Sequence, residues 1–327
     1  MSPVGKTHTN PFFIDAFKEA VMFKNVLVGV DGRPTGRDAI ALAAALTDPD
    51  GKLTLAYVRN DALSPLHAAV PGAIPSESEV SHKLLERERD HAQVNAELLS
   101  IVSFSPGASL HKQAGEQNAD LLVVGSCSRG AIGRAMLGND TRAALNGAPC
   151  AVAIAARGYA EHPMPLANVG VGYNDSPESK AAVTVARMVA APTKAQVHAL
   201  EVLPITVYSG FGVAPAVVGE DMDELLADAN ARLKELPEVD GRAIFGLAGE
   251  ELAAFGDGLD LLVVGSRGYG PMRRLVLGST STYLERHARS SLLVLPRLAT
   301  NPTVKDATAT DVRAETPTEP IAETVGC

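Results

Sequence analysis

The segment DLLVVGSRGYGPMRRLVLGSTS, residues 260–281, decides the fold because it has a near copy, DLLVVGSCSRGAIGRAMLGNDT, at residues 120–141. Matching positions in the two segments are 140 residues apart throughout. In both segments an apolar run ends in glycine, which predicts a strand that is buried on both faces and followed by a loop. The chain therefore contains an internal repeat.

Apolar runs and helical patterns around this unit extend the repeat to most of the chain. Strands are predicted in the first half at 25–30, 53–58, 100–104, 120–125 and 150–155, and in the second half at 168–173, 196–202, 242–245, 260–265 and 291–296. Helices are predicted at 35–47, 76–99, 176–190, 219–236 and 279–288. Strands that alternate with helices are typical of βαβ units and a parallel sheet.

We therefore expect an α/β fold of two tandem, doubly wound, Rossmann-like domains, each with a five-stranded parallel sheet of order 3-2-1-4-5 and related by a pseudo-two-fold axis. The expected divisions are an N-terminal lead-in (1–23), domain 1 (24–157), a linker (158–164), domain 2 (165–297) and a tail (298–327). Thr, Ala, Glu and Pro dominate the tail, so it is expected to be disordered.

Composition excludes several classes of protein. The chain has 327 residues, a formal net charge of −9 and 46% hydrophobic residues. That charge gives no general electrostatic attraction to nucleic acid or to an anionic membrane, and no apolar run approaches the length of a membrane span. Three cysteines do not suggest a disulfide framework, and the N-terminus lacks a signal-peptide pattern. A reducing cytoplasm is the expected compartment.

Each glycine pattern begins where the fourth strand of its domain ends. In a doubly wound sheet of this order, strands 1 and 4 flank a crevice where ligands bind. Gly265 and Gly268 would let the backbone approach a ligand without a Cβ in the way. Gly278, Ser279 and Thr280 open the last helix, whose free N–H groups attract an anion. This assembly suits the phosphates of a nucleotide, although the glycines could instead only make turns and Ser279 only cap a helix.

Other motifs that carry chemistry are absent from the sequence. Neither a GxxxxGK[ST] loop nor a GxGxxG loop is present, so the two common phosphate motifs do not explain the pattern. The eight histidines form no HExxH pair, and neither a CxxC knuckle nor a GxSxG elbow occurs. No catalytic residue and no metal ligand is predicted.

The motif G-x2-G-x9-G-[ST] after a DLLVVG strand, which Gly265, Gly268, Gly278 and Ser279 fulfil, resembles that of the universal stress protein family. The resemblance covers both halves and implies a tandem universal stress protein. It implies that a nucleoside lies near the residue after strand 1 and the valine that ends strand 2, with phosphates on the glycine motif. The implied residues of the second half are Asn174, Val202, Val264, Gly265, Gly268, Gly278, Ser279 and Thr280. Those of the first half are Asp31, Val58, Val124, Gly125, Ser128, Gly138 and Asn139.

The two halves depart from the family pattern in complementary ways. The first keeps Asp31 but has Ser128 and Asn139 in the phosphate motif, whereas the second keeps that motif but has Asn174 in place of the aspartate. We expect the second site to be the stronger. The resemblance also implies that the strands at 150–155 and 291–296 pair the two domains, and it leaves a homodimer of whole chains open.

The resemblance implies an ATP-binding regulator of the stress response, which takes ATP alone or with Mg²⁺ and is non-catalytic or weakly ATP-hydrolysing. Two alternatives stay open at this point. One is a nucleotide-independent dimeric interaction scaffold, and the other is a slow ATPase.

Overall fold

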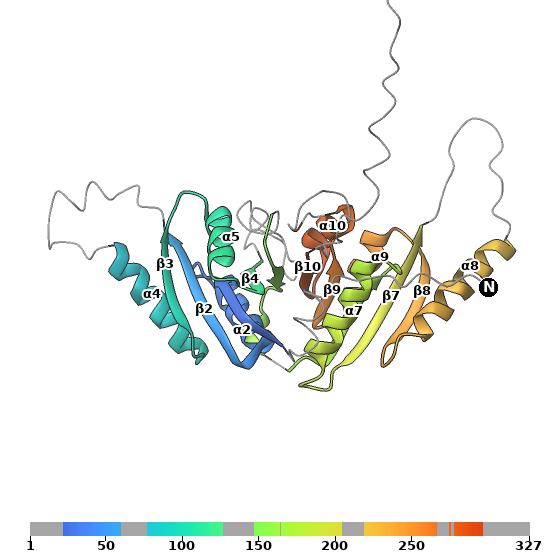
Figure 1. Cartoon of the computed structure of the whole chain (residues 1–327), viewed down its shortest axis with the longest axis horizontal. Coiled ribbons are helices and arrows are strands. Elements are labelled where there is room, and N and C mark those ends of the chain that lie inside the picture. Colours follow the sequence, from blue (N-terminus) through green and yellow to red (C-terminus); the bar gives the residue numbers. More distant parts are fainter. Residues whose placement is uncertain are drawn as a thin grey trace, which may run out of the picture.

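A computed structural model of the chain describes residues 22–59, 77–126, 147–163, 165–204, 219–266, 275 and 278–296. The tail and all but the last two residues of the lead-in lie outside these ranges. The described strands form one sheet in the order β3-β2-β1-β4-β5-β10-β9-β6-β7-β8. Each half therefore has the predicted order 3-2-1-4-5, and Figure 1 shows the two halves side by side.

The first repeat runs from β1 to β5. Its strands are β1 (Phe23–Gly29), β2 (Thr47–Arg59), β3 (Glu97–Val102), β4 (Leu121–Gly125) and β5 (Ala151–Ala155). Its described helices are α2 (Pro34–Leu46), α4 (Glu77–Ala92) and α5 (Pro106–Glu116). A short 3-10 helix, η1 (Tyr159–Glu161), lies in the linker.

The second repeat runs from β6 to β10. Its strands are β6 (Asn168–Tyr173), β7 (Gln196–Pro204), β8 (Asp240–Gly246), β9 (Leu261–Gly265) and β10 (Ser291–Leu295). Its described helices are α7 (Pro177–Ala190), α8 (Gly219–Lys234), α9 (Ala248–Gly256) and α10 (Ser279–His287).

All described strand pairs are parallel except the one at the centre of the sheet. There β10 pairs antiparallel with β5, with Leu292 opposite Ile154 and Val294 opposite Val152. All residues of both strands are buried. Both β5 and β10 thus have a neighbouring strand on each side, so neither exposes an apolar edge.

The sheet is the middle layer of three. On one face, α2, α4, α7 and α8 pack over a core that includes Ile40, Leu85 and Val185. On the other face, α5, α9 and α10 pack over a second core that includes Leu110, Leu252 and Leu284. Both cores contain residues from both repeats. Strands covered on both faces explain the continuous apolar runs of the sequence.

The helix predicted at 76–99 was wrong at its C-terminal end. Helix α4 ends at Ala92, and Gln93 has a left-handed backbone with φ of 54°. Residues 97–99 belong to β3, which pairs with β2 through Glu97 and Thr54. Val94 and Leu98 continue the helical spacing of apolar residues by coincidence, and strand pairing overrides it.

Candidate functional site

The carboxyl ends of β6, β7 and β9 meet at one edge of the second repeat. Val171 of β6 pairs with Val263 of β9, and Tyr173 of β6 pairs with Glu201 of β7. Asn174, which follows β6, therefore lies at the same edge as Gly265, which ends β9. This edge is the topological switch point of the sheet, where doubly wound proteins hold their ligands.

Asn174 is exposed and helps to start α7. Its Oδ1 accepts hydrogen bonds from Ser176 N at 3.3 Å and Ser176 Oγ at 2.7 Å. Ser176 in turn caps the helix, because its Oγ accepts from Ser179 N at 3.2 Å. The amide of Asn174 therefore orders the turn at the edge of the crevice.

Asp175 has a local role that the sequence does not reveal. It has a φ of 59°, and its Oδ1 lies 2.8 Å from Lys180 Nζ and accepts from Tyr173 Oη at 2.9 Å. The hydrogen bonds from Lys180 and Tyr173 lower the pKa of the Asp175 carboxyl, whereas burial and this carboxylate raise the pKa of Tyr173 to about 12. Two donors therefore already contact Oδ1 of Asp175, which ties this carboxylate to its own repeat.

Gly265 and Gly125 are glycines for a packing reason. A Cβ on Gly265 would lie 2.7 Å from Glu178 Cβ in the first turn of α7. A Cβ on Gly125 would overlap the carbonyl oxygen of Thr35 in the first turn of α2. The first helix of each repeat therefore passes directly over the end of the fourth strand, which forms one wall of the crevice.

Helix α10 begins at this edge without a side-chain cap. Gly278 is its N-cap residue with an extended backbone, and its carbonyl oxygen accepts from Thr282 N at 2.9 Å. Ser279 is exposed and occupies the first helical position, so the alternative in which Ser279 caps the helix was wrong. Thr280 follows and is half-buried. Gly278 has no side chain with which to cap the first-turn N–H groups, and such groups suit an anion.

Four predicted valines line the same core. Val124 and Val264, near the ends of β4 and β9, are buried, and Val58 and Val202 are half-buried near the ends of β2 and β7. All four pack in the core beneath α5, α9 and α10. Their side chains can offer a ligand an apolar surface but no hydrogen bond.

In the first repeat, Asp31 is exposed and follows β1. Its Oδ1 accepts from Arg33 N at 3.0 Å, and its Oδ2 lies 3.9 Å from Arg33 Nε. Gly32 between them has a φ of 72°, the left-handed region that favours glycine. Asp31 therefore orders a tight turn between β1 and α2.

Two buried hydroxyls at the crevice were missed. Ser126 and Ser266 directly follow the last residues of β4 and β9, and each is about as buried as a core residue. Neither Oγ has a hydrogen-bond partner in the described structure. The signal in the sequence is the repeated VVGS, in which the same serine follows the glycine in both repeats.

The other residues predicted for the two sites lie outside the described residues. They are Ser128, Gly138, Asn139 and Gly268. Within the described ranges, no group of three or more His, Cys, Asp or Glu side chains could hold a metal ion. Among the same residues, no helix is long and apolar enough to cross a membrane.

Comparisons with known proteins agree with this architecture. A family model described as the universal stress protein family matches residues 22–156 and 166–296. Universal stress protein Rv2005c of Mycobacterium tuberculosis is 30% identical over 182 residues, which cover 54% of this chain and 61% of that relative. The match thus spans less than two thirds of the relative's length.

Matches to two further proteins cover a larger share of those proteins' own length. Universal stress protein Rv1636 of Mycobacterium tuberculosis is 32% identical over 126 residues, which are 36% of this chain and 85% of that protein. The crystal structure of a universal stress protein from Archaeoglobus fulgidus has a TM-score of 0.53 at 16% identity, over 83% of this chain and 97% of that one. That likeness concerns the fold, and the family match covers both repeats. The chain belongs to the universal stress protein family.

Proposed function

We propose that the second repeat binds an adenine nucleotide, ATP in the first instance, and that the protein acts as a nucleotide-dependent regulator. The observation that carries the proposal is the start of α10. Gly278 leaves the first turn without a side-chain cap at the carboxyl edge of the sheet, beside β9. Unsatisfied N–H groups and the positive end of the helix dipole favour a phosphate there.

The nucleoside would lie between Asn174 and Val202. Val202 offers an apolar contact, and the exposed Asn174 offers amide groups in place of the aspartate of the first repeat. The buried Ser266 Oγ, which has no partner in the described structure, supplies a further polar atom beside Gly265. These groups bind and orient a ligand, and we assign none of them a catalytic step.

A nucleotide-independent scaffold is the second candidate, and one observation favours it. The close packing of Gly125 on α2 and of Gly265 on α7 explains these two glycines without any ligand. Under this alternative the glycine loops are architectural, and binding of partner proteins, or of a second copy, would not depend on nucleotide.

The first test is a count of nucleotide on the full-length protein. The protein is purified gently and denatured, and the released small molecules are separated, identified and counted per chain. The proposal predicts one adenine nucleotide per chain, or stoichiometric binding when ATP is added. Counting ADP over time in the same samples separates a binding protein from a slow ATPase.

Ser279→Glu locates the ligand. Ser279 is exposed at the first position of α10, where a carboxylate favours the helix but repels a phosphate. We expect nucleotide affinity to fall about tenfold or more while stability is unchanged or slightly raised. The matched control is Ser105→Glu at the exposed start of α5, which should leave affinity unchanged. Unchanged binding in Ser279→Glu would place the nucleotide away from the start of α10, and no binding in the natural protein would favour the scaffold.

A further inference from the structure

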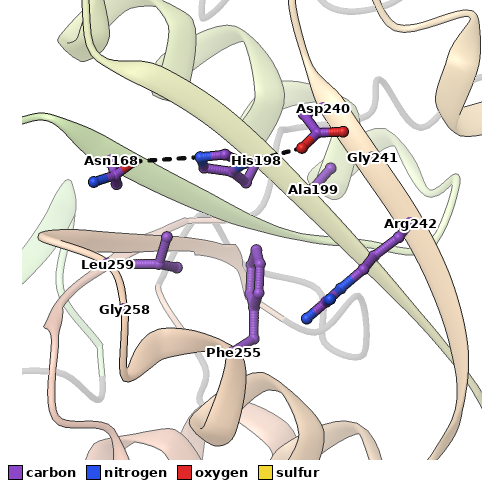
Figure 2. A pocket seen from close by; sticks show the side chains of 9 residues that line it. All are labelled: Asn168, His198, Ala199, Asp240, Gly241, Arg242, Phe255, Gly258 and Leu259. Atoms are coloured by element: carbon purple, nitrogen blue, oxygen red, sulfur yellow. Dashed lines mark hydrogen bonds and ion pairs between the residues drawn. The ribbon is translucent and has the colours of Figure 1, made fainter.

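A cavity lies at the edge of the second repeat opposite to the predicted nucleotide site. It has a volume of about 250 Å³ and opens where β6, β7 and β8 begin, next to the C-terminal end of α9. Figure 2 shows its walls: Asn168, His198 and Asp240 form one row, and Phe255 and Leu259 face that row. None of the residues assigned to the nucleotide lines this cavity.

The first repeat has a different set of side chains at the matching places. His198 pairs with Asp240 in β8, and the matching pair of the first repeat is Thr54 with Glu97. Two residues further along the edge strands, the second repeat has Arg242 and the first has Leu99. An imidazole and a guanidinium are thus specific to the second repeat, although both repeats share the strand register.

The absence of a side chain at Gly170 makes room for the apolar wall of the cavity. A Cβ on Gly170 would overlap Leu259 and would lie 2.9 Å from Phe255 Cε1. The Phe255 ring and Leu259 therefore lie directly against the backbone of β6. Packing fixes this wall, which offers a ligand an apolar surface about as large as one aromatic ring.

The polar wall is also held in place. His198 Nε2 lies 3.4 Å from Asn168 Oδ1, and His198 Nδ1 lies 3.4 Å from Asp240 Oδ2. Because each ring nitrogen faces an acceptor, the imidazole is oriented by its neighbours. The single carboxylate of this wall, Asp240, already faces the imidazole.

Arg242 is the group that has the most capacity to bind a ligand. Its guanidinium lies 6.0 Å from the centre of the Phe255 ring and points toward the ring in Figure 2. No carboxylate of the described residues forms an ion pair with it. An exposed guanidinium stacked on a ring keeps its fork of N–H donors free for a planar anion.

We propose that this cavity binds a small molecule with one carboxylate on an apolar, ring-sized body. The carboxylate would pair with Arg242, and the body would pack on Phe255 and Leu259. The volume is below the range of about 300 Å³ and upward that drug-sized ligands occupy, so the ligand is small. Asp240 would repel a second anionic group near the rim. The proposal does not depend on nucleotide binding.

The test uses benzoate as the probe and the full chain, observed by NMR at the methyl groups of Leu259 and the ring of Phe255. Benzoate should give saturable shifts at both residues with a dissociation constant of about 10 mM or lower, the range expected for so few atoms. Benzamide has the same shape without the charge, and its affinity should be at least about tenfold lower than that of benzoate. Inorganic phosphate should not shift Leu259.

Arg242→Met keeps the length of the side chain and removes its charge. Arg242 is exposed on an edge strand, so the variant should fold, and thermal unfolding checks this. Benzoate affinity should fall about tenfold or more. Lys52→Met is the matched control, because Lys52 pairs with Glu97 at the same edge of the first repeat, 2.8 Å away. It should leave benzoate binding unchanged.

Three results would overturn the proposal. The first is the absence of saturable shifts with benzoate. The second is equal binding of benzoate and benzamide, which would remove the role of the carboxylate. The third is an unchanged affinity in Arg242→Met, which would show that Arg242 does not hold the ligand.

Discussion

The two repeats agree at the positions that set the sheet and differ around its rim. In the first repeat, Asp120 accepts from Lys24 N at 2.8 Å and Asn25 N at 3.1 Å. In the second, Asp260 accepts from Ala167 N at 2.7 Å and Asn168 N at 2.8 Å. The same carboxylate thus caps the start of the first strand in both repeats.

The ion pairs that hold the outer helices differ between the two repeats. In the first repeat the buried Glu88 belongs to helix α4 and pairs with Arg37 of α2 at 2.7 Å. In the second repeat the arginine is on the corresponding outer helix, where Arg232 of α8 pairs with the buried Glu201 of β7 at 2.9 Å. The first pair joins two helices and the second joins a helix to a strand, so the two repeats hold their outer helices with unrelated ion pairs.

The largest effect should come from the glycine at the end of the fourth strand. Gly125→Ala would overlap backbone atoms of Thr35, whereas Gly265→Ala would place a Cβ 2.7 Å from Glu178 Cβ and 3.1 Å from its backbone carbonyl. Both clashes are with atoms that cannot swing away, but the overlap at Gly125 is the deeper, so we expect losses of about 3 kcal/mol for Gly125→Ala and about 1–2 kcal/mol for Gly265→Ala. Chemical unfolding of the full chain measures both.

Gly115→Ala is the control for this pair. A Cβ at Gly115, inside α5, meets nothing within 4 Å. Because alanine favours a helix over glycine, it should raise stability by about 0.5–1 kcal/mol. Equal losses at Gly125 and Gly265 would mean that the two crevice walls are packed alike, contrary to the comparison.

A smaller effect is expected where the first repeat holds the linker. Asp38 of α2 is buried and accepts from Gly158 N at 3.0 Å and Ala160 N at 2.8 Å, at the start of η1. Asp38→Ala leaves both donors without their partner and should cost about 2 kcal/mol. Asp38→Asn keeps one acceptor and should cost about half of that, as measured by thermal unfolding. A loss as large for Asn as for Ala would show that the charge, not the number of acceptors, holds the linker.

The strand positions could be predicted because the evidence for them is local. Parallel strands buried on both faces read as short apolar runs, and the repeat supplied each run twice. The strand predicted at 168–173 matches β6, and the helix predicted at 279–288 matches α10 to within one residue. The helix predicted at 76–99 was too long because only tertiary pairing distinguishes Glu97–Val102 from a continuing helix.

The site could be predicted less completely because its details depend on contacts between distant segments. The uncapped start at Gly278 follows from the sequence, since glycine offers no side-chain acceptor. The bonds of Asp175 to Lys180 and Tyr173, and the packing of Gly265 on Glu178, need the folded positions of α7 and β9. The cavity beside Arg242 combines residues from β6, β7, β8 and α9, and no motif joins them.

The smallest effect should be the pH-dependent one at Glu88. Its side chain is fully buried, with Arg37 Nε at 2.7 Å and Arg87 Nη2 at 2.9 Å. Burial alone would raise the pKa of this carboxyl, but the hydrogen bonds from Arg37 and Arg87 outweigh burial and lower it. Since the pKa of Glu88 is lower folded than unfolded, its stabilisation is present above the unfolded value of about 4.3. That stabilisation is lost as the pH falls through the folded pKa.

Glu88→Gln should therefore lower the free energy of unfolding by about 1 kcal/mol at neutral pH, and the gap should close below about pH 4. Urea unfolding of both proteins across this range measures the gap. Glu238→Gln is the control, because Glu238 forms a 2.7 Å ion pair with Arg187 but its side chain is 80% exposed, so the change should stay within about 0.5 kcal/mol. A gap for Glu88→Gln that stays constant down to acid pH would assign the effect to packing. The Glu88 side chain would then stabilise the first repeat through its volume, and its charge would be incidental.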